Sequence, residues 1–144
     1  MSCCHIYFCP FTGLGLHYGY RGDTWLKNRI KIFSEFVLPS ILGQGNDFYT
    51  WFQWRLEEET NPIVQEFQTT LKGIEGLNPI HTFGGITMWD DKYDDKTASE
   101  RLLKSLEISL PKLKEIINAD YVLLTIQPSD DMYLYNMVEK IQKY

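Results

Sequence analysis

Apolar residues along the chain fall alternately into short continuous runs and into three- or four-residue spacings, the pattern of strands alternating with helices. The runs that predict strands are His5–Phe11, Phe48–Leu56, Ile80–Trp89 and Tyr121–Ile126. The spacings predict four helices: one capped by Asp23 or Thr24, one that begins at Pro62 with Asn61 as its cap, one that begins at Ala98 and one that begins at Tyr133. The order β-α-β-α-β-α-β-α predicts an α/β fold, a doubly wound and mostly parallel sheet with helices on both faces.

Two prolines and one apolar run refine this picture. Pro39 is expected to bend or end the first helix, and Pro111 to kink or restart the one over Ala98–Ile117, because proline lacks a backbone donor. The run Tyr121–Ile126 is continuously apolar. It therefore predicts a central parallel strand covered on both faces.

Composition restricts the class of protein. The chain has 144 residues, 44% hydrophobic and 23% charged, which predicts one domain over residues 1–144. The 14 Lys and Arg against 19 Asp and Glu give a net charge of −5, and no basic stretch is present, so nucleic acid is excluded as the main partner.

The N-terminal segment and the hydropathy of the chain bear on its location. No apolar run reaches the roughly 18–20 residues of a membrane span, and the N-terminus does not resemble a secretory signal. All three cysteines lie in the first nine residues, so they cannot form a disulfide framework, and with His5 they lack the paired spacing of zinc sites. A cytoplasmic location is expected.

Three loops hold candidate chemistry, because ligands of parallel sheets bind at the carboxyl ends of the strands. They are the glycine-rich loop Thr12–Gly22, the acidic loop Glu57–Glu59 and the turn Ser129–Asp131. In the last, the carboxylates of Asp130 and Asp131 offer hard oxygen ligands for Mg²⁺ or Mn²⁺, and such an ion would neutralise a diphosphate. The same turn also suits the cap of the last helix, and the two roles do not exclude each other.

The segment Thr125–Tyr133, after Ala119–Val122, resembles the strand and DxD motif of GT-A-fold glycosyltransferases, nearest to their rhamnosyltransferase-like group. Two upstream segments resemble the same group: Arg21, Trp25, Arg29 and Phe33 at four-residue spacing, and Phe36–Trp51 with its Leu-Pro-Ser-Ile pattern. The resemblance implies a Rossmann-like GT-A-type domain that binds a nucleotide-diphosphate sugar with Mn²⁺ or Mg²⁺. It also implies hexosyl transfer, rhamnosyl in that group, to an unidentified acceptor, a glycan or another molecule.

Residue by residue, the resemblance implies a donor site and a metal site but no catalytic base. The metal ligands are Asp130 and Asp131, and the donor-binding residues are Thr12, Arg21, Arg29, Glu57, Ser129 and Asp130. A guanidinium matches phosphate in a bidentate way. Arg29 also falls on an apolar helix face, where a half-buried ion pair is an equal alternative, and the acidic loop is also typical of a solvated segment beside a helix N-terminus.

The chain departs from the family pattern at two positions. Ile126 and Pro128 stand where the pattern has Arg and the first Asp of the DxD motif, and the sequence ends about one helix later. The chain is therefore expected to be a fragment truncated after this turn, a minimal domain or a domain without catalysis. The alternative function is a non-catalytic interaction or assembly module, whose aromatic residues, 15% of the chain, would form a homo-oligomer interface.

Overall fold

A computed structural model describes residues 1–12, 22–45, 47–85 and 95–129 together with Met132, Lys140 and Lys143, the side chains of residues 95–98 and 102 excepted. In chain order its elements are β1 Cys3–Cys9, α1 Asp23–Ile32, a π-helical turn Phe33–Val37, α2 Leu38–Leu42, β2 Tyr49–Arg55, a 3₁₀ turn Leu56–Glu58, α3 Pro62–Lys72, β3 Pro79–Gly85, α4 Asp95–Ile116 and β4 Tyr121–Ile126. The predicted α/β alternation is confirmed over these residues.

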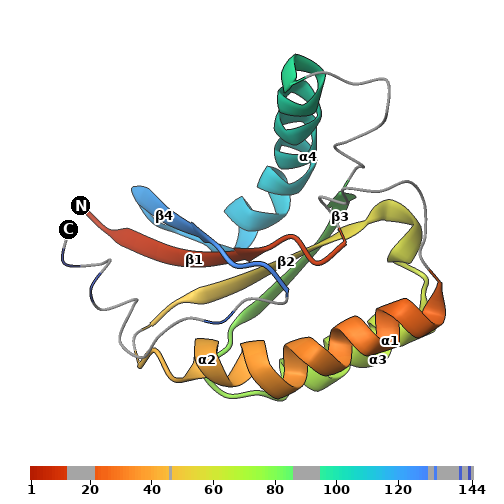
Figure 1. The fold of residues 1–144 in the computed structure, drawn as a ribbon. Helices are drawn as coiled ribbons and strands as arrows, with labels where there is room; N and C mark the ends of the chain where they lie inside the picture. Colours follow the sequence, from red (N-terminus) through yellow and green to blue (C-terminus); the bar gives the residue numbers. More distant parts are fainter. Residues whose placement is uncertain are drawn as a thin grey trace.

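The strands form one four-stranded sheet in the order β3-β2-β1-β4, and all of the pairs are parallel. In β1, Ile6 lies opposite Tyr49 of β2 and Leu124 of β4. Helices α1, α2 and α3 cover one face of the sheet, and α4 lies on the other (Figure 1). This is an α/β arrangement consistent with a Rossmann-like topology, in which connections on opposite sides of β1 place helices on opposite faces.

The larger part of the core lies between the sheet and helices α1–α3. Phe33, Phe52 and Phe67 come from three different elements and are all buried. The Phe33 ring lies 5.5 Å from that of Phe52 and 5.9 Å from that of Phe67, edge to face in both pairs. Such aromatic contacts add to the free energy gained from burial and hold the helix layer against β2.

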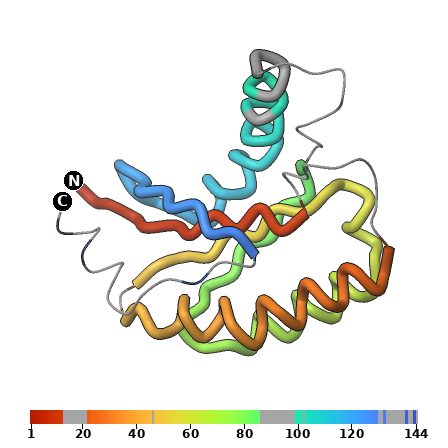
Figure 2. The backbone as a smooth tube through the Cα atoms, in the orientation of Figure 1, coloured from red at the N-terminus to blue at the C-terminus, as the bar shows by residue number. Residues whose placement is uncertain are grey.

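The other face holds α4 with a smaller apolar cluster and a polar contact. Leu113 is buried against residues of β1, β2 and β3. Gln53 of β2 is fully buried, and its Nε2 donates to the Oγ of Ser105, at 2.6 Å, and of Ser109, at 3.1 Å. Helix α4 comes closest to the sheet toward its C-terminal end (Figure 2). The contacts of α4 with the sheet described above run from Ser105 to Leu113.

Local helix signals act only in part as the sequence predicts. Helix α1 begins at Asp23, but neither Asp23 nor Thr24 caps it, because its N-cap position is Gly22, which has no side chain to accept a hydrogen bond. The Oδ1 of Asn61 accepts from Ile63 N at 2.9 Å, with Pro62 at the first position of α3, so the predicted cap is confirmed. Pro39 does not end the first helical segment, which continues to Leu42. The π-helical turn just before it, where Leu38 N donates to Phe33 O, accommodates a residue without an N–H. Pro111 lies inside α4, which runs without interruption to Ile116.

The prediction that Tyr121–Ile126 is a central strand covered on both faces is wrong. This strand, β4, lies at the end of the strand order, beside β1. Tyr121, Val122, Leu124 and Ile126 are 58%, 50%, 44% and 60% exposed. A continuous apolar run is typical of a buried strand, but the position of a strand in the sheet is set by distant pairings that the run itself does not encode.

Two further predictions concern residues outside the described ranges. They are the second half of the predicted third strand, after Gly85, and most of the helix predicted from Tyr133 to Tyr144.

Candidate functional site

The sheet order reverses at β1, and this defines where a ligand would bind. The chain moves from β1 to β2 and β3 on one side, and then crosses to β4 on the other. In open parallel sheets the crevice at such a switch point, at the carboxyl ends of the strands, is the usual ligand site. Thr12 follows β1 at this edge, and Ser129 follows β4. Gln127 N donates to Phe8 O at 2.7 Å, so the two strands stay paired up to that point.

A buried network joins the end of β1 to the end of β2. Thr12 Oγ1 donates to Glu58 Oε2. Arg55 N lies 3.2 Å from Glu58 Oε2 and 3.2 Å from Thr12 Oγ1. Thr12 N in turn donates to Gln53 O at 3.3 Å. Because Thr12 is 6% and Glu58 5% exposed, these bonds fix the start of the loop after β1 against the 3₁₀ turn after β2.

Burial raises the pKa of Glu58 above its ordinary value. The hydrogen bonds from Thr12 and from Arg55 N, and the charge of Arg55, favour the carboxylate and offset part of this rise, while the neighbouring Glu57 adds to it. The carboxyl group thus keeps its proton to a higher pH than an exposed glutamate does. Such a group at the carboxyl edge of the sheet is a candidate for proton transfer or for holding Thr12 in place.

The predicted donor-binding residues that the structure describes lie in different surroundings. Thr12 and Ser129 are buried at the carboxyl edge, at 6% and 8% exposure. Glu57 is exposed on the turn where Glu58 is buried. Arg29 is half-buried on α1, with its guanidinium carbon 5.3 Å from the centre of the Trp25 ring, a cation–π contact. Three predicted site residues lie outside the described ranges: Arg21, Asp130 and Asp131.

Sequence reasoning named the acidic loop but did not select Glu58 as the partner of Thr12. Three consecutive glutamates look alike in sequence, and only the 3₁₀ turn decides which of them faces the core. The signal that could have found it is local. Glu58 is the third residue of that turn, where a glutamate reaches back to the backbone N–H of the residue before the turn, here Arg55.

Among the described residues, no group of three or more His, Cys, Asp or Glu could hold a metal ion. The predicted ligands Asp130 and Asp131 are not part of that search, because they lie outside those residues.

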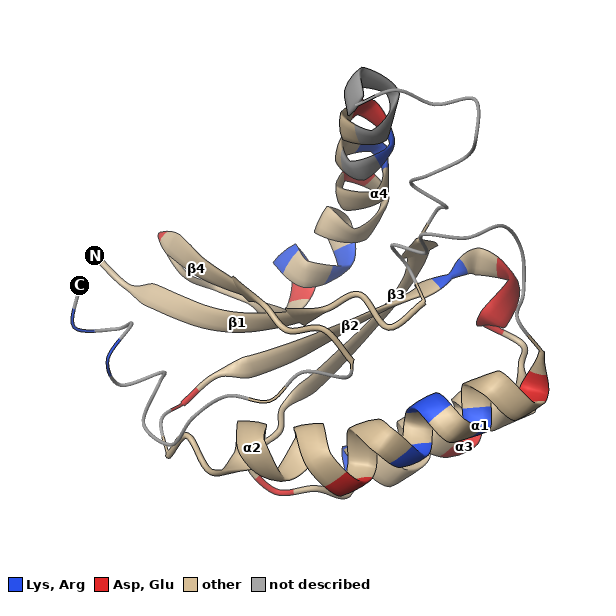
Figure 3. Cartoon of the chain, in the orientation of Figure 1, with Lys and Arg blue, Asp and Glu red and all other residues tan. Residues whose placement is uncertain are grey.

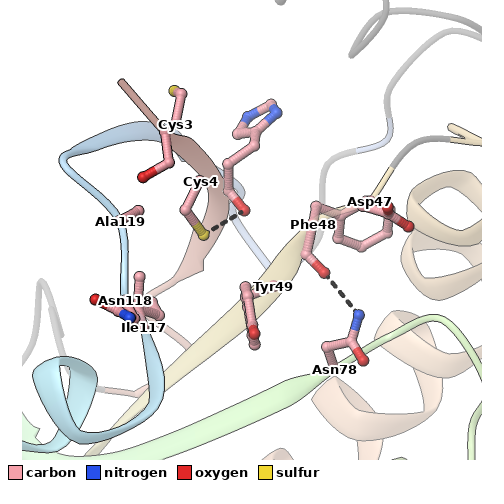
Figure 4. A pocket seen from close by; sticks show the side chains of 11 residues that line it. Cys3, Cys4, Asp47, Phe48, Tyr49, Asn78, Ile117, Asn118 and Ala119 are labelled. Carbon is pink, nitrogen blue, oxygen red and sulfur yellow. Dashed lines mark hydrogen bonds between the residues drawn. The ribbon is translucent and has the colours of Figure 1, made fainter.

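A pocket at the opposite, amino edge of the sheet is lined by two of the three cysteines, Cys3 and Cys4 (Figure 4). It has a volume of about 400 Å³ and is lined in part by Cys3, Cys4, Asp47 and Asn118. Cys4 Sγ contacts the carbonyl of His5 at 3.8 Å, and Asn78 Nδ2 donates to Phe48 O at 2.9 Å. Burial, with Cys3 adding, raises the pKa of the Cys4 thiol. The thiol therefore stays protonated, which makes it a poor nucleophile and metal ligand.

A second pocket, of about 550 Å³, runs along the outer side of β3. It is lined in part by His81 and Gly84 of the strand and by Ile108 and Lys112 of α4. The residues that line these two pockets do not include Thr12, Glu58 or Ser129.

None of the helices in the described ranges combines the length and the apolar character required to cross a membrane. Compared with protein-family models, with curated proteins and with solved structures, the chain matches none of them.

Proposed function

We propose that this chain is a nucleotide-diphosphate-sugar-binding domain of the glycosyltransferase type, with its donor site at the carboxyl ends of β1 and β4. The observation that carries the proposal is the reversal of strand order at β1, which brings Thr12 and Ser129 to one edge of an all-parallel sheet. In the sequence, Ser129 leads directly into Asp130 and Asp131, the carboxylates of the DxD-like segment.

The described residues support an anion site at this edge. Helix α1 begins there, at Asp23, after the loop that leaves β1 (Figure 1). A helix N-terminus carries unpaired N–H groups and a partial positive charge that favour phosphate. Arg21, two residues before α1 in the sequence, adds a guanidinium that can bind phosphate in a bidentate way.

Each site residue has a proposed role. Glu58 holds Thr12 through their buried hydrogen bond, so that Thr12 shapes this edge of the donor site, and Ser129 offers its hydroxyl group to the donor. Asp130 and Asp131 would hold a divalent cation, Mn²⁺ or Mg²⁺, whose charge would neutralise the diphosphate as the sugar leaves. The acceptor is a glycan or another nucleophile, and no residue is assigned as its base.

The test is thermal unfolding of the chain with nucleotide diphosphates and their sugars, with and without Mn²⁺. A ligand that binds only the folded state at 100 times its Kd stabilises that state by about 2.7 kcal/mol, which raises Tm by several degrees. We expect a rise that needs both nucleotide and metal and that disappears in Asp130→Ala.

Asp47→Ala is the matched control, because it removes an exposed carboxylate at the opposite edge of the sheet. It should keep the full ligand-dependent rise in Tm. A rise that survives in Asp130→Ala and is lost in Asp47→Ala would move the site to the amino edge and refute the proposal.

A second candidate function is a non-catalytic assembly module. Pro128 in place of the first Asp of the motif, and the exposed apolar residues of β4, favour it. The same thermal unfolding experiment separates the two candidate functions. A well-folded sample that no nucleotide stabilises, with or without metal, favours the assembly module.

A further inference from the structure

The backbone of β4 has a defined inner and outer side. Tyr121 N donates to Ser2 O at 3.1 Å, and Gln127 N donates to Phe8 O at 2.7 Å, so the odd-numbered residues of β4 turn their backbone groups toward β1. Alternation along a strand then turns the N–H and C=O of Val122 and Leu124 away from β1. Among the described residues, β4 pairs with β1 and with no strand on its other side.

The side chains of this edge are apolar and exposed. Val122 is 50% and Leu124 44% exposed, and both lie on the α4 face of the sheet, in register with Cys4 and Ile6 of β1. The strand Tyr121–Ile126 contains no charged residue (Figure 3), and its sequence has no proline. Natural edge strands are usually protected from pairing by lysine, proline or a bulge. This strand has none of these, so its edge is competent to pair with another strand.

We propose that a second copy of this chain docks on β4, so that the two strands pair antiparallel about a two-fold axis at Leu123. In this register Val122 of each copy lies opposite Leu124 of the other. The outward N–H and C=O groups of these two residues then pair across the interface. The two four-stranded sheets join into one continuous sheet.

Symmetry and charge favour a second copy as the occupant. A two-fold axis requires a self-complementary surface, and this strand offers apolar residues opposite apolar residues on the α4 face, with Tyr121 opposite Thr125 on the other. The chain carries a net charge of −5, but none of it lies in Tyr121–Ile126. The carboxylate of Asp120, next to the strand, accepts from Ser2 N at 2.8 Å and Ser2 Oγ at 3.2 Å. Two copies can thus meet here without placing charged side chains within the paired segment.

The first experiment measures molar mass by sedimentation equilibrium from micromolar to hundreds of micromolar chain. We expect a concentration-dependent rise from the 16.9 kDa monomer toward twice that mass. Leu124→Lys should shift the association to at least tenfold higher concentration, because it places two ammonium groups at the joined edge. Leu110→Lys is the matched control, because Leu110 lies on α4 and is 42% exposed, against 44% for Leu124. This variant should leave the association unchanged.

The second experiment tests the register by oxidative crosslinking. At the axis, Leu123 faces Leu123 of the second copy as a non-hydrogen-bonded pair, where side chains lie closest and disulfide geometry fits. Leu123→Cys should therefore give a crosslinked dimer, and Thr125→Cys, which faces Tyr121, much less. The unsubstituted chain under the same oxidant reports any crosslinks through Cys3, which is exposed.

The outcomes decide the proposal. A chain that stays monomeric over the whole concentration range overturns it, as does a dimer that Leu124→Lys leaves intact. Equal crosslinking at residues 123 and 125 overturns the register. Neither experiment involves nucleotide, so the dimer and the proposed donor site stand or fall independently.

Discussion

Two side chains, the buried Glu58 and the half-buried His81, link the stability of this fold to pH in opposite directions. Burial raises the pKa of Glu58 above its ordinary value of 4.5. The neutral carboxyl therefore contributes to the stability of the folded state fully below pH 4.5, and this contribution is lost as pH rises through the pKa that Glu58 has in the folded chain. Burial lowers the pKa of His81 from 6.5 to about 4. As pH falls, His81 therefore takes up its proton at a higher pH in the unfolded chain than in the folded chain. The stability of the fold is lost as pH falls from 6.5 toward 4.

His81 is the residue whose substitution tests this linkage. Trp54 Nε1 donates to His81 Nδ1 at 3.1 Å, and His81 Nε2 is buried without a hydrogen-bond partner among the described residues. A proton added to the ring would create a charge with no acceptor. His81→Gln keeps a side chain that can accept from Trp54 but removes the titration. We expect its unfolding free energy to fall less between pH 6.5 and 4, by at most about 3 kcal/mol.

Chemical denaturation of both chains at several pH values measures this difference. His5 also has a pKa lowered by burial, and the same sign applies to it, so part of the acid lability should remain in His81→Gln. Parallel pH profiles of the two chains would show that His81 is not the group that titrates.

At the scale of single residues, the sequence predicts which residue types lie at a strand end better than it predicts which residues contact each other. Thr12 and the acidic loop Glu57–Glu59 are readable as polar residues at strand ends. That Glu58 rather than Glu57 meets Thr12 depends on the path of the 3₁₀ turn and on the pairing of β1 with β2, a contact between residues 46 positions apart. Local patterns hold no information on such a contact.

At the scale of elements, the close approach of α4 to β3 depends on one glycine. A Cβ on Gly84 would lie 2.6 Å from Ile108 Cγ2 and 2.9 Å from its Cβ, closer than side-chain atoms pack. Gly84→Ala should therefore push α4 off the sheet and destabilise the fold by about 1–3 kcal/mol, the usual cost of overpacking. Urea denaturation of the variant measures the loss.

Gly73→Ala is the control for this prediction. Its Cβ would meet Thr70 O at 3.5 Å, an ordinary contact, and its φ of −78° suits alanine, so the stability should change little. Ile108→Ala in the Gly84→Ala background should recover part of the loss, since it removes the nearest clashing atom. A Gly84→Ala chain as stable as the parent would mean that α4 does not pack this closely.

Elements with local signals are readable from the sequence, and elements placed by distant contacts are not. Asn61 and Pro62 start α3 as predicted because a cap depends only on its own turn. The π-helical turn before Pro39 was not predicted, since sequence spacing does not distinguish a widened turn from a kink. The edge position of β4 was missed for a different reason: strand order depends on which strand β1 accepts on its second side.

At the scale of the whole molecule, the strand order predicts a gradient of hydrogen exchange. β1 and β2 lie inside the sheet, so their amides should exchange most slowly. In dilute solution the outward amides of Val122 and Leu124 should exchange much faster than that of Leu123, which faces β1. Residue-resolved exchange by NMR measures this. Equal protection of these three amides at low concentration would contradict an edge position for β4.

The contact between Ser2 and Asp120 joins residues 118 positions apart, so the pairing of β1 with β4 requires nearly the whole chain. During synthesis β1 can pair with β2 once Tyr49–Arg55 has been made, but its other side needs Tyr121–Ile126, which the ribosome makes more than a hundred residues after β1. The nascent chain therefore carries β1 with one side bare through most of its synthesis. Any factor that slows translation between β3 and β4 prolongs that exposure, and with it the time in which β1 can pair with a strand from another nascent chain.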